Sequence, residues 1–301
     1  IGITRFDPNG ANILYSLIIG GSDGDLPNSM IVNEAGELYV LGTTGSSDFP
    51  MCPVAQQCGF DITFNNPAGS PAANFTSGNG ILFTQGSDMV VFKIDATGSA
   101  MLSSTFLGGS GNDGLNDDND NVANIQYNGT DLHYNYGDAF RGEIILDSTG
   151  NVFIASSTNS LDFPLGGDGL TTGLGGEQDA VLTSLSSDLT TLRHSRYIGG
   201  SDDDGGYSLK LNGSGQVYVT GGTKSADFPT TATTIQPSFS GVTDGFLGLY
   251  DAGDGSQGNA TFLGTTVYDQ SYLVEVDRDG DVYVTGQSEG NDPTANAAYL
   301  E

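Results

Sequence analysis

The sequence of 301 residues predicts an all-β fold, a β-propeller built from four-stranded antiparallel blades. Three observations support this prediction. One stretch recurs four times, and its clearest copy, Tyr197–Pro229, reads YIGGSDDDGGYSLKLNGSGQVYVTGGTKSADFP. Its apolar runs alternate with a period of two and are rich in Val, Tyr, Leu and Thr, which is typical of strands. Equivalent residues such as Phe163 and Phe228 lie about 65 positions apart, a spacing that indicates a repeat architecture.

Each repeat first encodes a hairpin with a four-residue turn. The other three copies begin at Leu17, Phe106 and Phe262. In every copy the turn starts with Asn or Asp and ends with Gly: Asn33/Gly36, Asp147/Gly150, Asn212/Gly215 and Asp277/Gly280. An Asx side chain can accept a hydrogen bond from the backbone two residues on, and Gly supplies the positive φ that closes a hairpin. We therefore expect a strand on each side of these turns.

A second hairpin lies between the repeated stretches. Its first strand opens with Asp88, Asp179 or Asp244, and its second strand ends at Gly-Gly or Gly. One unit is therefore four antiparallel strands. Such a sheet has two faces to bury, and stacking several sheets around an axis buries both, which is the β-propeller. We expect a single domain over residues 1–301 with four detectable blades.

The motifs GGSxxD, D/NxxGxVYVTG, SxDFP and the Asp-opened strand, taken in this order, resemble the bacterial SBBP repeat, the "seven-bladed" β-propeller repeat of secreted and surface proteins. The resemblance covers nearly the whole chain. It implies a propeller fold and an extracellular or cell-surface location, and it implies no catalytic residues. We expect the parent protein to carry a signal sequence and further domains outside this chain.

The aspartates of SxDFP, which are Asp48, Asp162 and Asp227, are expected to be structural. Proline extends the backbone of the residue before it, and the phenylalanine is expected to pack between blades.

The two ends of the chain match different halves of one blade. Ile1–Asp7 aligns with Val90–Asp95, inside a third strand, whereas residues 291–301 stop before a third strand begins. We expect the N-terminal hairpin, Ile1–Ile19, to complete the blade that begins at Tyr272 and so to close a four-bladed ring. The alternative is a window from a longer ring with more blades.

A first insertion, at residues 51–86, contains both cysteines. Cys52 and Cys58 are close enough in sequence for a small disulfide-closed loop, and two free thiols are the alternative. A disulfide would place the protein in an oxidising compartment, in agreement with the resemblance.

A second insertion, at residues 110–139, is rich in Asp and Asn. It offers hard oxygen ligands of the kind that Ca²⁺ prefers, and the candidate ligands are Asp113, Asn116, Asp117, Asp118 and Asp120. The spacing does not match an EF-hand loop, so a solvated acidic loop is the alternative. The aromatic patch that follows could form a ligand surface for sugars or anchor the loop to the propeller: Tyr127, His133, Tyr134 and Tyr136.

Asp277, Asp279 and Asp281 form DRDGD, which imitates part of a calcium loop. The equivalent turns carry Ala35, Thr149 and Ser214 in place of the middle acid. We therefore interpret DRDGD first as a hairpin turn and second as a metal site.

The formal net charge of −29 excludes several partners. A nucleic-acid binder needs a basic surface, which three Lys and five Arg cannot supply. Direct insertion into membranes is not expected either. The acids after each Gly-Gly, such as Asp25 and Asp204, are expected to lie on one face, where they would attract cations or simply form an acidic surface.

The sequence gives no specific sign of catalysis. It has no G-x-S-x-G elbow, no HExxH and no glycine-rich phosphate loop. His194 and Ser195 are neighbours on a predicted strand, so their side chains point to opposite faces. With so many acids, a pair at glycosidase spacing carries no information. Arg141 and Arg196 are scarce cations that could bind an anion or pair with Asp.

We expect a non-enzymatic extracellular or cell-surface module, a rigid scaffold for adhesion, protein–protein interaction or surface assembly, stabilised by Ca²⁺ or by a local disulfide. The expected partners are other surface proteins, with glycans as further candidates. Two alternatives stay open. One is a glycan-binding or glycan-cleaving propeller, and the other is a subunit of a self-assembling surface layer or filament.

Overall fold

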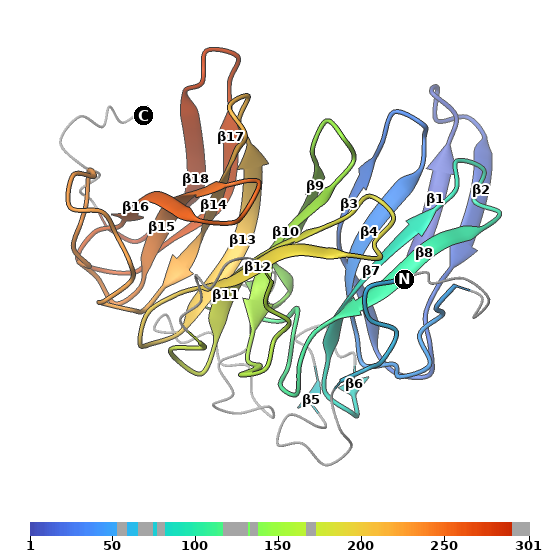
Figure 1. Ribbon diagram of the computed structural model, residues 1–301, viewed down its shortest axis with the longest axis horizontal. Helices are drawn as coiled ribbons and strands as arrows, with labels where there is room; N and C mark the ends of the chain where they lie inside the picture. The colour runs from blue at the N-terminus through green and yellow to red at the C-terminus, as the bar shows by residue number, and fades with distance from the viewer. Residues whose placement is uncertain are drawn as a thin grey trace.

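A computed structural model describes residues 1–52, 59–65, 75–76, 82–116, 132, 138–166 and 173–290. The described residues form an all-β fold of antiparallel sheets, with one short 3₁₀ helix, η1 (Asp138–Phe140). The sheets stand side by side along the long axis of the molecule (Figure 1). The predicted fold class, with four-stranded antiparallel sheets of the kind that form propeller blades, is confirmed.

Three sheets have four strands in simple antiparallel order, and three smaller sheets have two strands each. The first sheet consists of β3 (Asp25–Val32), β4 (Leu38–Thr44), β7 (Asp88–Ile94) and β8 (Met101–Leu107). The second consists of β9 (Glu143–Leu146), β10 (Val152–Thr158), β11 (Asp179–Leu185) and β12 (Leu192–Ile198). The third consists of β13 (Asp204–Leu211), β14 (Gln216–Thr223), β15 (Asp244–Asp251) and β16 (Gln257–Leu263). The two-stranded sheets are the first hairpin, β1 (Gly2–Phe6) and β2 (Ile13–Ile18), the last hairpin, β17 (Asp269–Val276) and β18 (Val282–Ser288), and the pair β5 (Phe75–Thr76) and β6 (Leu82–Phe83).

The predicted Asx–Gly turns close the hairpins. The side chain of Asn212 accepts hydrogen bonds from the backbone N–H of Ser214 at 2.9 Å and of Gln216 at 3.0 Å, and Gly215 has a φ of +77°. Asp147 makes the same pair of contacts in the second sheet. These hydrogen bonds and the glycine therefore fix the register between the first and second strands of each four-stranded sheet.

The hydrophobic core lies between neighbouring sheets. Along β4, Tyr39 and Leu41 pack against Ile154 and Val181 of the second sheet. Their neighbours in sequence, Leu38 and Val40, pack in the opposite direction, against the first hairpin. Because successive side chains of a strand point to opposite faces, one strand contributes to two interfaces. The third sheet repeats this arrangement against the second.

The phenylalanines of SxDFP pack between blades, as predicted. Phe228 lies 4.6 Å from Phe246 between ring centroids, and Phe49 lies 5.7 Å from Phe92. Phe163 packs beside Tyr197 in the cluster between the first and second sheets.

The arrangement of the two terminal hairpins differs from the prediction. Among the described residues β1–β2 and β17–β18 form separate two-stranded sheets, and they lie at opposite sides of Figure 1. The N-terminal hairpin therefore does not complete the last blade in this structure. The first hairpin stacks on the first sheet, where Ile3 and Ile19 share a core cluster with Val40 and Phe92, and it lies far from β18.

Within the described part of the chain, no helix has the length and apolarity needed to cross a membrane.

Candidate functional site

A cluster of glycine and aspartate recurs at each junction between sheets, and we call it a carboxylate node. The node between the first and second sheets consists of Asp88, Gly108, Gly109, Asp113 and Asp162. The next node consists of Asp179, Gly199, Gly200, Asp204 and Asp227. Parts of the same cluster recur at Gly20, Gly21, Asp25 and Asp48, and at Asp244, Gly264 and Asp269. These nodes contain the GGSxxD and SxDFP motifs of the sequence.

The two glycines of a node leave room for carboxylates. A Cβ placed on Gly108 would lie 2.5 Å from Oδ1 of Asp88 and 2.8 Å from Oδ2 of Asp113. A Cβ on Gly109 would lie 2.5 Å from Oδ1 of Asp162. Real Cβ atoms do not approach oxygen so closely, so the Gly-Gly pair is needed for close packing rather than for flexibility.

Each SxDFP aspartate connects the loop after the second strand of its sheet to the Gly-Gly-Ser segment that precedes the same sheet. Oδ1 of Asp162 accepts hydrogen bonds from the backbone N–H of Ser110 at 2.7 Å and from its hydroxyl at 2.9 Å. Asp227 makes the same two contacts with Ser201, and Asp48 makes them with Ser22. The bond from the Ser110 backbone is the main cause that lowers the pKa of Asp162. These carboxylates have the structural role that the sequence predicted.

Asp113, Asp204 and Asp269, which begin or precede the first strand of their sheets, are buried within their nodes. Oδ2 of Asp113 accepts hydrogen bonds from Gly109 N–H at 2.8 Å and from the Ser160 hydroxyl at 2.7 Å, and Oδ1 accepts one from the Thr158 hydroxyl. Its own N–H donates to the Ser87 carbonyl of the first sheet at 2.8 Å. Burial raises the pKa of Asp113 to about 7.

The aspartates that open the third strands face these groups. Oδ1 of Asp88, of Asp179 and of Asp244 is buried and accepts no hydrogen bond from the described residues. Burial, followed by the nearby Asp113 carboxylate, raises the pKa of Asp88 well above its usual range. Burial also raises the pKa of Asp179 to about 7 and that of Asp244 to about 6. Two buried carboxylates that face each other cannot both be charged at low cost, so each node is suited to hold a proton.

The sequence reasoning assigned no role to Asp88, Asp179 and Asp244. The signal was present, because each stands at the same place in its repeat, immediately before an apolar strand. What the sequence did not show is that each would meet a second carboxylate from the next repeat.

The predicted calcium ligands fall in two groups. Asp113 uses its oxygens for the contacts described above, and the Asn116 amide donates to Leu132 O and Tyr207 OH, both at 3.0 Å, and accepts from Gln178 at 2.7 Å. Both side chains are engaged in hydrogen bonds within the fold, and calcium binding by them stays a prediction. Asp117, Asp118 and Asp120 lie outside the described residues, so calcium binding there stays a prediction. Among the described residues, no group of three His, Cys, Asp or Glu side chains is placed to hold a metal ion.

In the DRDGD turn, Asp277 has the hairpin role. Its Oδ1 accepts hydrogen bonds from the backbone N–H of Asp279 at 2.9 Å and of Asp281 at 3.0 Å. These bonds match those of the equivalent turns, which carry no acid at the middle position.

The other predicted site residues lie mostly outside the described part of the chain. Cys52 is buried, but Cys58 is outside the described residues, so the disulfide stays a prediction. The candidate ligand surface of Tyr127, His133, Tyr134 and Tyr136 also lies outside them.

Arg141, Arg196 and His194 make contacts within the fold. Arg141 stacks on Tyr272, with its guanidinium carbon 3.7 Å from the ring centroid, and Arg196 donates to Gly255 O at 2.9 Å. His194 is buried beside Phe153, and burial lowers its pKa. The Ser195 hydroxyl pairs with Thr183 at 2.9 Å.

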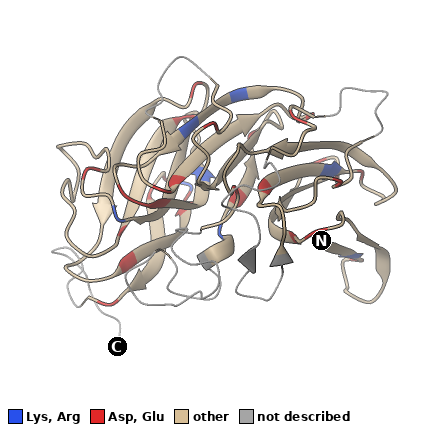
Figure 2. Cartoon of the chain, turned by 90° about the horizontal axis from the view of Figure 1, so that it is seen from below, with Lys and Arg blue, Asp and Glu red and all other residues tan. Residues whose placement is uncertain are grey.

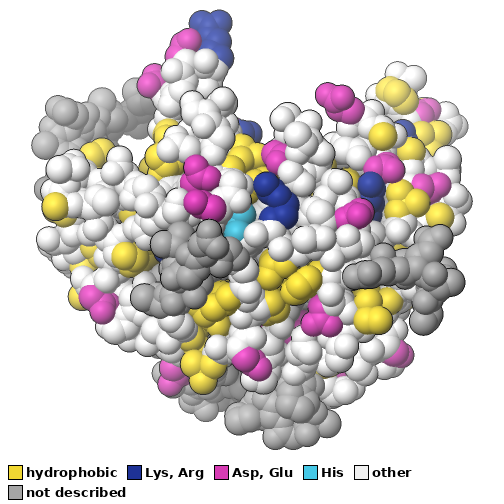
Figure 3. All heavy atoms as spheres, viewed as in Figure 1, with side chains coloured by type: hydrophobic (Ala, Val, Ile, Leu, Met, Phe, Trp, Pro, Cys, Tyr) yellow, Lys and Arg dark blue, Asp and Glu magenta, His cyan; other side chains and the backbone are white. Residues whose placement is uncertain are grey.

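Charged groups are distributed unevenly over the molecule. Asp and Glu occur on strands and loops throughout the chain, whereas Lys and Arg are few (Figure 2). On the face drawn in Figure 3, the acidic side chains lie in small separate groups rather than in one continuous patch.

Comparisons with known proteins add little beyond this geometry. No protein-family model matches the chain, and no curated protein matches it. Among solved structures, the chain is similar to the crystal structure of quinohemoprotein alcohol dehydrogenase from Comamonas testosteroni, with a TM-score of 0.37 and 12% sequence identity. That match covers 100% of this chain and 57% of the dehydrogenase chain, and at this TM-score we base no argument on it. The resemblance to the SBBP repeat stays a prediction.

Proposed function

We propose that this chain is a non-enzymatic extracellular or cell-surface module, a rigid β-propeller scaffold for adhesion and protein–protein interaction. The supporting observation is that the polar residues that recur in each repeat form hydrogen bonds within the fold. The carboxylates that recur in every repeat bind backbone N–H groups of the segment that leaves the preceding sheet, and Asp162 and Asp227 thereby connect two sheets. Their chemistry holds sheets together, and the loops between the sheets are then available to contact partners.

Charge and location support the same role. A net charge of −29 keeps a surface protein soluble and disfavours nucleic acids. The resemblance to a bacterial repeat of secreted and surface proteins agrees with an extracellular setting, and we include that location in the proposal.

The test compares binding with catalysis. Beads coated with the chain are passed over immobilised extracellular proteins, and the chain is incubated in parallel with a panel of polysaccharides. We expect saturable retention on at least one protein surface and no release of reducing ends. Heat-unfolded chain on identical beads is the control. Release of reducing ends by folded chain would overturn the proposal in favour of a polysaccharide-active propeller.

Calcium is part of the proposal and has its own test. Thermal unfolding is measured with excess Ca²⁺ and with a chelator. A ligand at a hundredfold excess over its Kd adds about 2.7 kcal/mol to the free energy of unfolding, so the midpoint should rise clearly.

Two variants locate the calcium effect. Neutralising Asp117, Asp118 and Asp120 together to Asn should abolish the rise in midpoint, whereas Asp277→Asn should keep it. An equal midpoint with Ca²⁺ and with chelator would show that calcium does not stabilise the protein.

A further inference from the structure

Two of the carboxylate nodes lie directly beside a backbone hydrogen bond that crosses between sheets. At the junction of the second and third sheets, the N–H of Asp204 donates to the carbonyl of Gln178 at 2.9 Å. At the junction of the third sheet and the last hairpin, the N–H of Asp269 donates to the carbonyl of Thr243 at 2.8 Å. Each acceptor stands immediately before the aspartate that opens a third strand. A buried acid therefore stands at each end of these two cross-sheet bonds.

At the first of these junctions the two acids approach the same glycine. A Cβ placed on Gly199 would overlap Oδ1 of Asp179 and would lie 2.6 Å from Oδ2 of Asp204. Oδ2 of Asp204 already accepts hydrogen bonds from the Gly200 N–H at 2.8 Å and from the Ser225 hydroxyl at 2.7 Å. Oδ1 of Asp179 accepts none from the described residues. Because a protonated carboxyl is a donor, a proton on Oδ1 of Asp179 provides a hydrogen bond to the facing carboxylate.

The second junction repeats this arrangement with different neighbours. Oδ2 of Asp269 accepts hydrogen bonds from the Thr265 N–H at 2.6 Å and from its hydroxyl at 2.8 Å. Oδ1 of Asp244 lies against Gly264 and accepts no hydrogen bond from the described residues. In both junctions, the acid that begins the first strand accepts two donors on one oxygen. The acid that opens the third strand is the one with an unfilled oxygen.

The charged and titratable groups near these two unfilled oxygens are mostly other acids. Around Asp179 they are Asp203 and Asp204 from the segment that enters the third sheet, Asp227 from the loop after β14, Tyr197 from β12, and Lys224, which forms an ion pair with Asp203 at 2.9 Å. Facing Asp244 is Asp269 of β17. Burial is the main cause that raises the pKa of Asp179 to about 7 and that of Asp244 to about 6. The folded protein therefore keeps these two acids protonated at pH values at which solvated carboxyls are ionised.

We propose that these two nodes are proton-dependent junctions between sheets. The proton on Asp179 or Asp244 joins the two carboxyls of its node and so keeps the neighbouring cross-sheet backbone bond closed. When that proton is lost to solvent, two carboxylates face each other in a buried site, and their repulsion favours opening of the bond. The junctions, rather than the strands within each sheet, are then the part of the fold that responds to pH. This inference does not depend on the proposed surface role.

Hydrogen exchange at the two cross-sheet amides, measured by NMR, tests the proposal. Opening a junction exposes a carboxyl with the usual pKa of about 4, so opening releases a proton at any pH between that value and the raised pKa. Protection of the Asp204 N–H, corrected for the intrinsic exchange rate, should therefore fall at least about tenfold between pH 4 and pH 7. Protection of the Asp269 N–H should fall between pH 4 and pH 6 and change little above this range.

The internal control is an amide outside the nodes. The N–H of Asn212 donates to the Gln216 carbonyl at 2.9 Å in a hairpin turn, and its protection should change by less than about twofold over the same range. A chelator is present in every sample, so that no metal ion can replace the proton.

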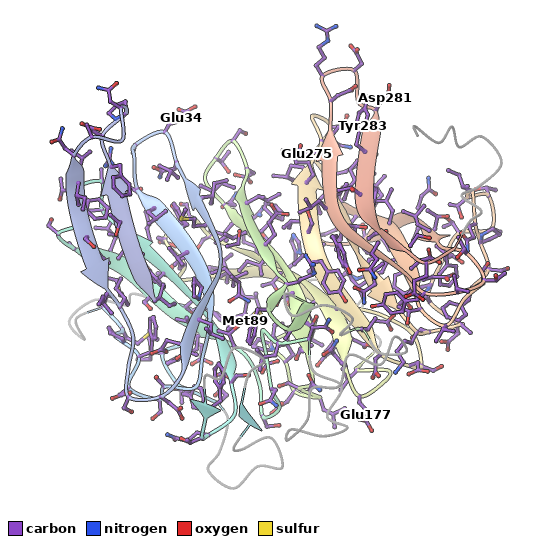
Figure 4. The ribbon with its side chains drawn as sticks, turned by 180° about the vertical axis from the view of Figure 1, so that it is seen from behind. Glu34, Met89, Glu177, Glu275, Asp281 and Tyr283 are labelled. Carbon is purple, nitrogen blue, oxygen red and sulfur yellow. The ribbon has the colours of Figure 1, made fainter. Side chains whose placement is uncertain are left out.

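Two single variants serve as controls for each other. Asp179→Asn no longer titrates but keeps a donor, because its amide N–H replaces the carboxyl O–H. It should preserve protection of the Asp204 N–H at pH 7 and leave the fall at the Asp269 N–H unchanged. Asp244→Asn should do the reverse. Glu177→Gln removes an exposed acid two residues before Asp179, at the lower edge of Figure 4, and should behave like the wild type at both amides.

Three results would overturn the proposal. They are equal protection of both cross-sheet amides at pH 4 and pH 7, a parallel fall at the Asn212 N–H, and a fall at the Asp204 N–H that Asp179→Asn leaves unchanged. The parallel fall would mean that pH acts on global stability and not on the junctions. Circular dichroism confirms that each variant is folded, and if one variant unfolds, the other node provides the same test.

Discussion

The first four-stranded sheet and the first hairpin are built from equivalent stretches of the repeat, yet they differ in how much of their apolar surface is buried. Phe106 lies in a core cluster with Ile3 and Ile19 of the first hairpin, and its ring packs against Phe64 at 5.8 Å between centroids, whereas the equivalent Ile18 is exposed. The two residues occupy the same place on equivalent strands. The difference shows that burial in this architecture is supplied by the neighbouring sheet and not by the sheet that carries the residue.

The largest effect on stability should come from truncating Phe106, the buried residue of the equivalent pair Phe106 and Ile18. Phe106→Ala should lower the free energy of unfolding by about 3–5 kcal/mol, because it leaves a cavity between the first hairpin and the first sheet. Ile18→Ala, at the equivalent exposed position, should change it by less than about 0.5 kcal/mol. Denaturant unfolding of both variants at low protein concentration measures the difference. Equal losses would show that the first hairpin does not bury Phe106.

A second comparison concerns glycines. Gly108→Ala should lower the free energy of unfolding by about 1–3 kcal/mol, since its Cβ would overlap the carboxylates of Asp88 and Asp113. Gly2→Ala is the control, because no atom lies within 4 Å of the Cβ position there. The midpoint of thermal unfolding is the measurement. A Gly108→Ala midpoint equal to that of Gly2→Ala would contradict the packing of the node.

The carboxylate nodes should make stability depend on pH. The pKa of Asp113 and of Asp179 is raised to about 7 in the folded state, so the folded protein holds protons that the unfolded chain has released. Stability is therefore greatest near the usual carboxyl pKa of about 4 and falls as the pH rises to about 7.

A matched pair of variants isolates this effect. Asp179→Asn should weaken the dependence of stability on pH, so that the melting temperature decreases by a few degrees less between pH 4 and pH 7. Asp95→Asn should leave the slope in this range unchanged, because the Thr97 hydroxyl is the main cause that lowers the pKa of Asp95 to about 2. Melting temperatures of the wild type and of both variants are measured from pH 4 to pH 8. If Asp179→Asn loses as much melting temperature as the wild type, the assignment of the effect to Asp179 is wrong.

The smallest effect should come from the charge pair of the first sheet. Glu37→Gln removes the contact with Lys93, whose side chain is 14% exposed, and should cost about 0.5–1 kcal/mol. Asp281→Asn, the equivalent change on the last hairpin, should leave the monomer unchanged within about 0.5 kcal/mol. A larger loss for Asp281→Asn in dilute solution would mean that Asp281 is engaged within a single copy.

The sequence predicted local features well because they depend on nearby residues. The Asx–Gly turns, the strand pairs and the place of Phe228 between sheets follow from spacing and alternation. The position of the first hairpin could not be predicted in the same way. Alignment with a third strand does not show how far the hairpin lies from β18, because that distance depends on how all the sheets are arranged, whereas the structure shows Ile3 and Ile19 packed on the first sheet.

The candidate site was predicted only in part for a similar reason. Asp162 and Asp227 were assigned structural roles from their own motif. The pairing of Asp88 with Asp113 depends on how two repeats meet, which no single repeat encodes. Pattern reasoning identified both residues, but only three-dimensional packing shows that they face each other.

The contacts of the nodes also affect how the repeat should be divided. Asp162 follows β10 but accepts hydrogen bonds from Ser110, and Asp113 precedes β9 but binds to Ser87 in the preceding sheet. A boundary drawn between sheets would separate Asp88 from Asp113 and Asp162, the other carboxylates of its node. For grafting, duplication or circular permutation, the transferable module should therefore run from the middle of one sheet to the middle of the next, keeping each node intact.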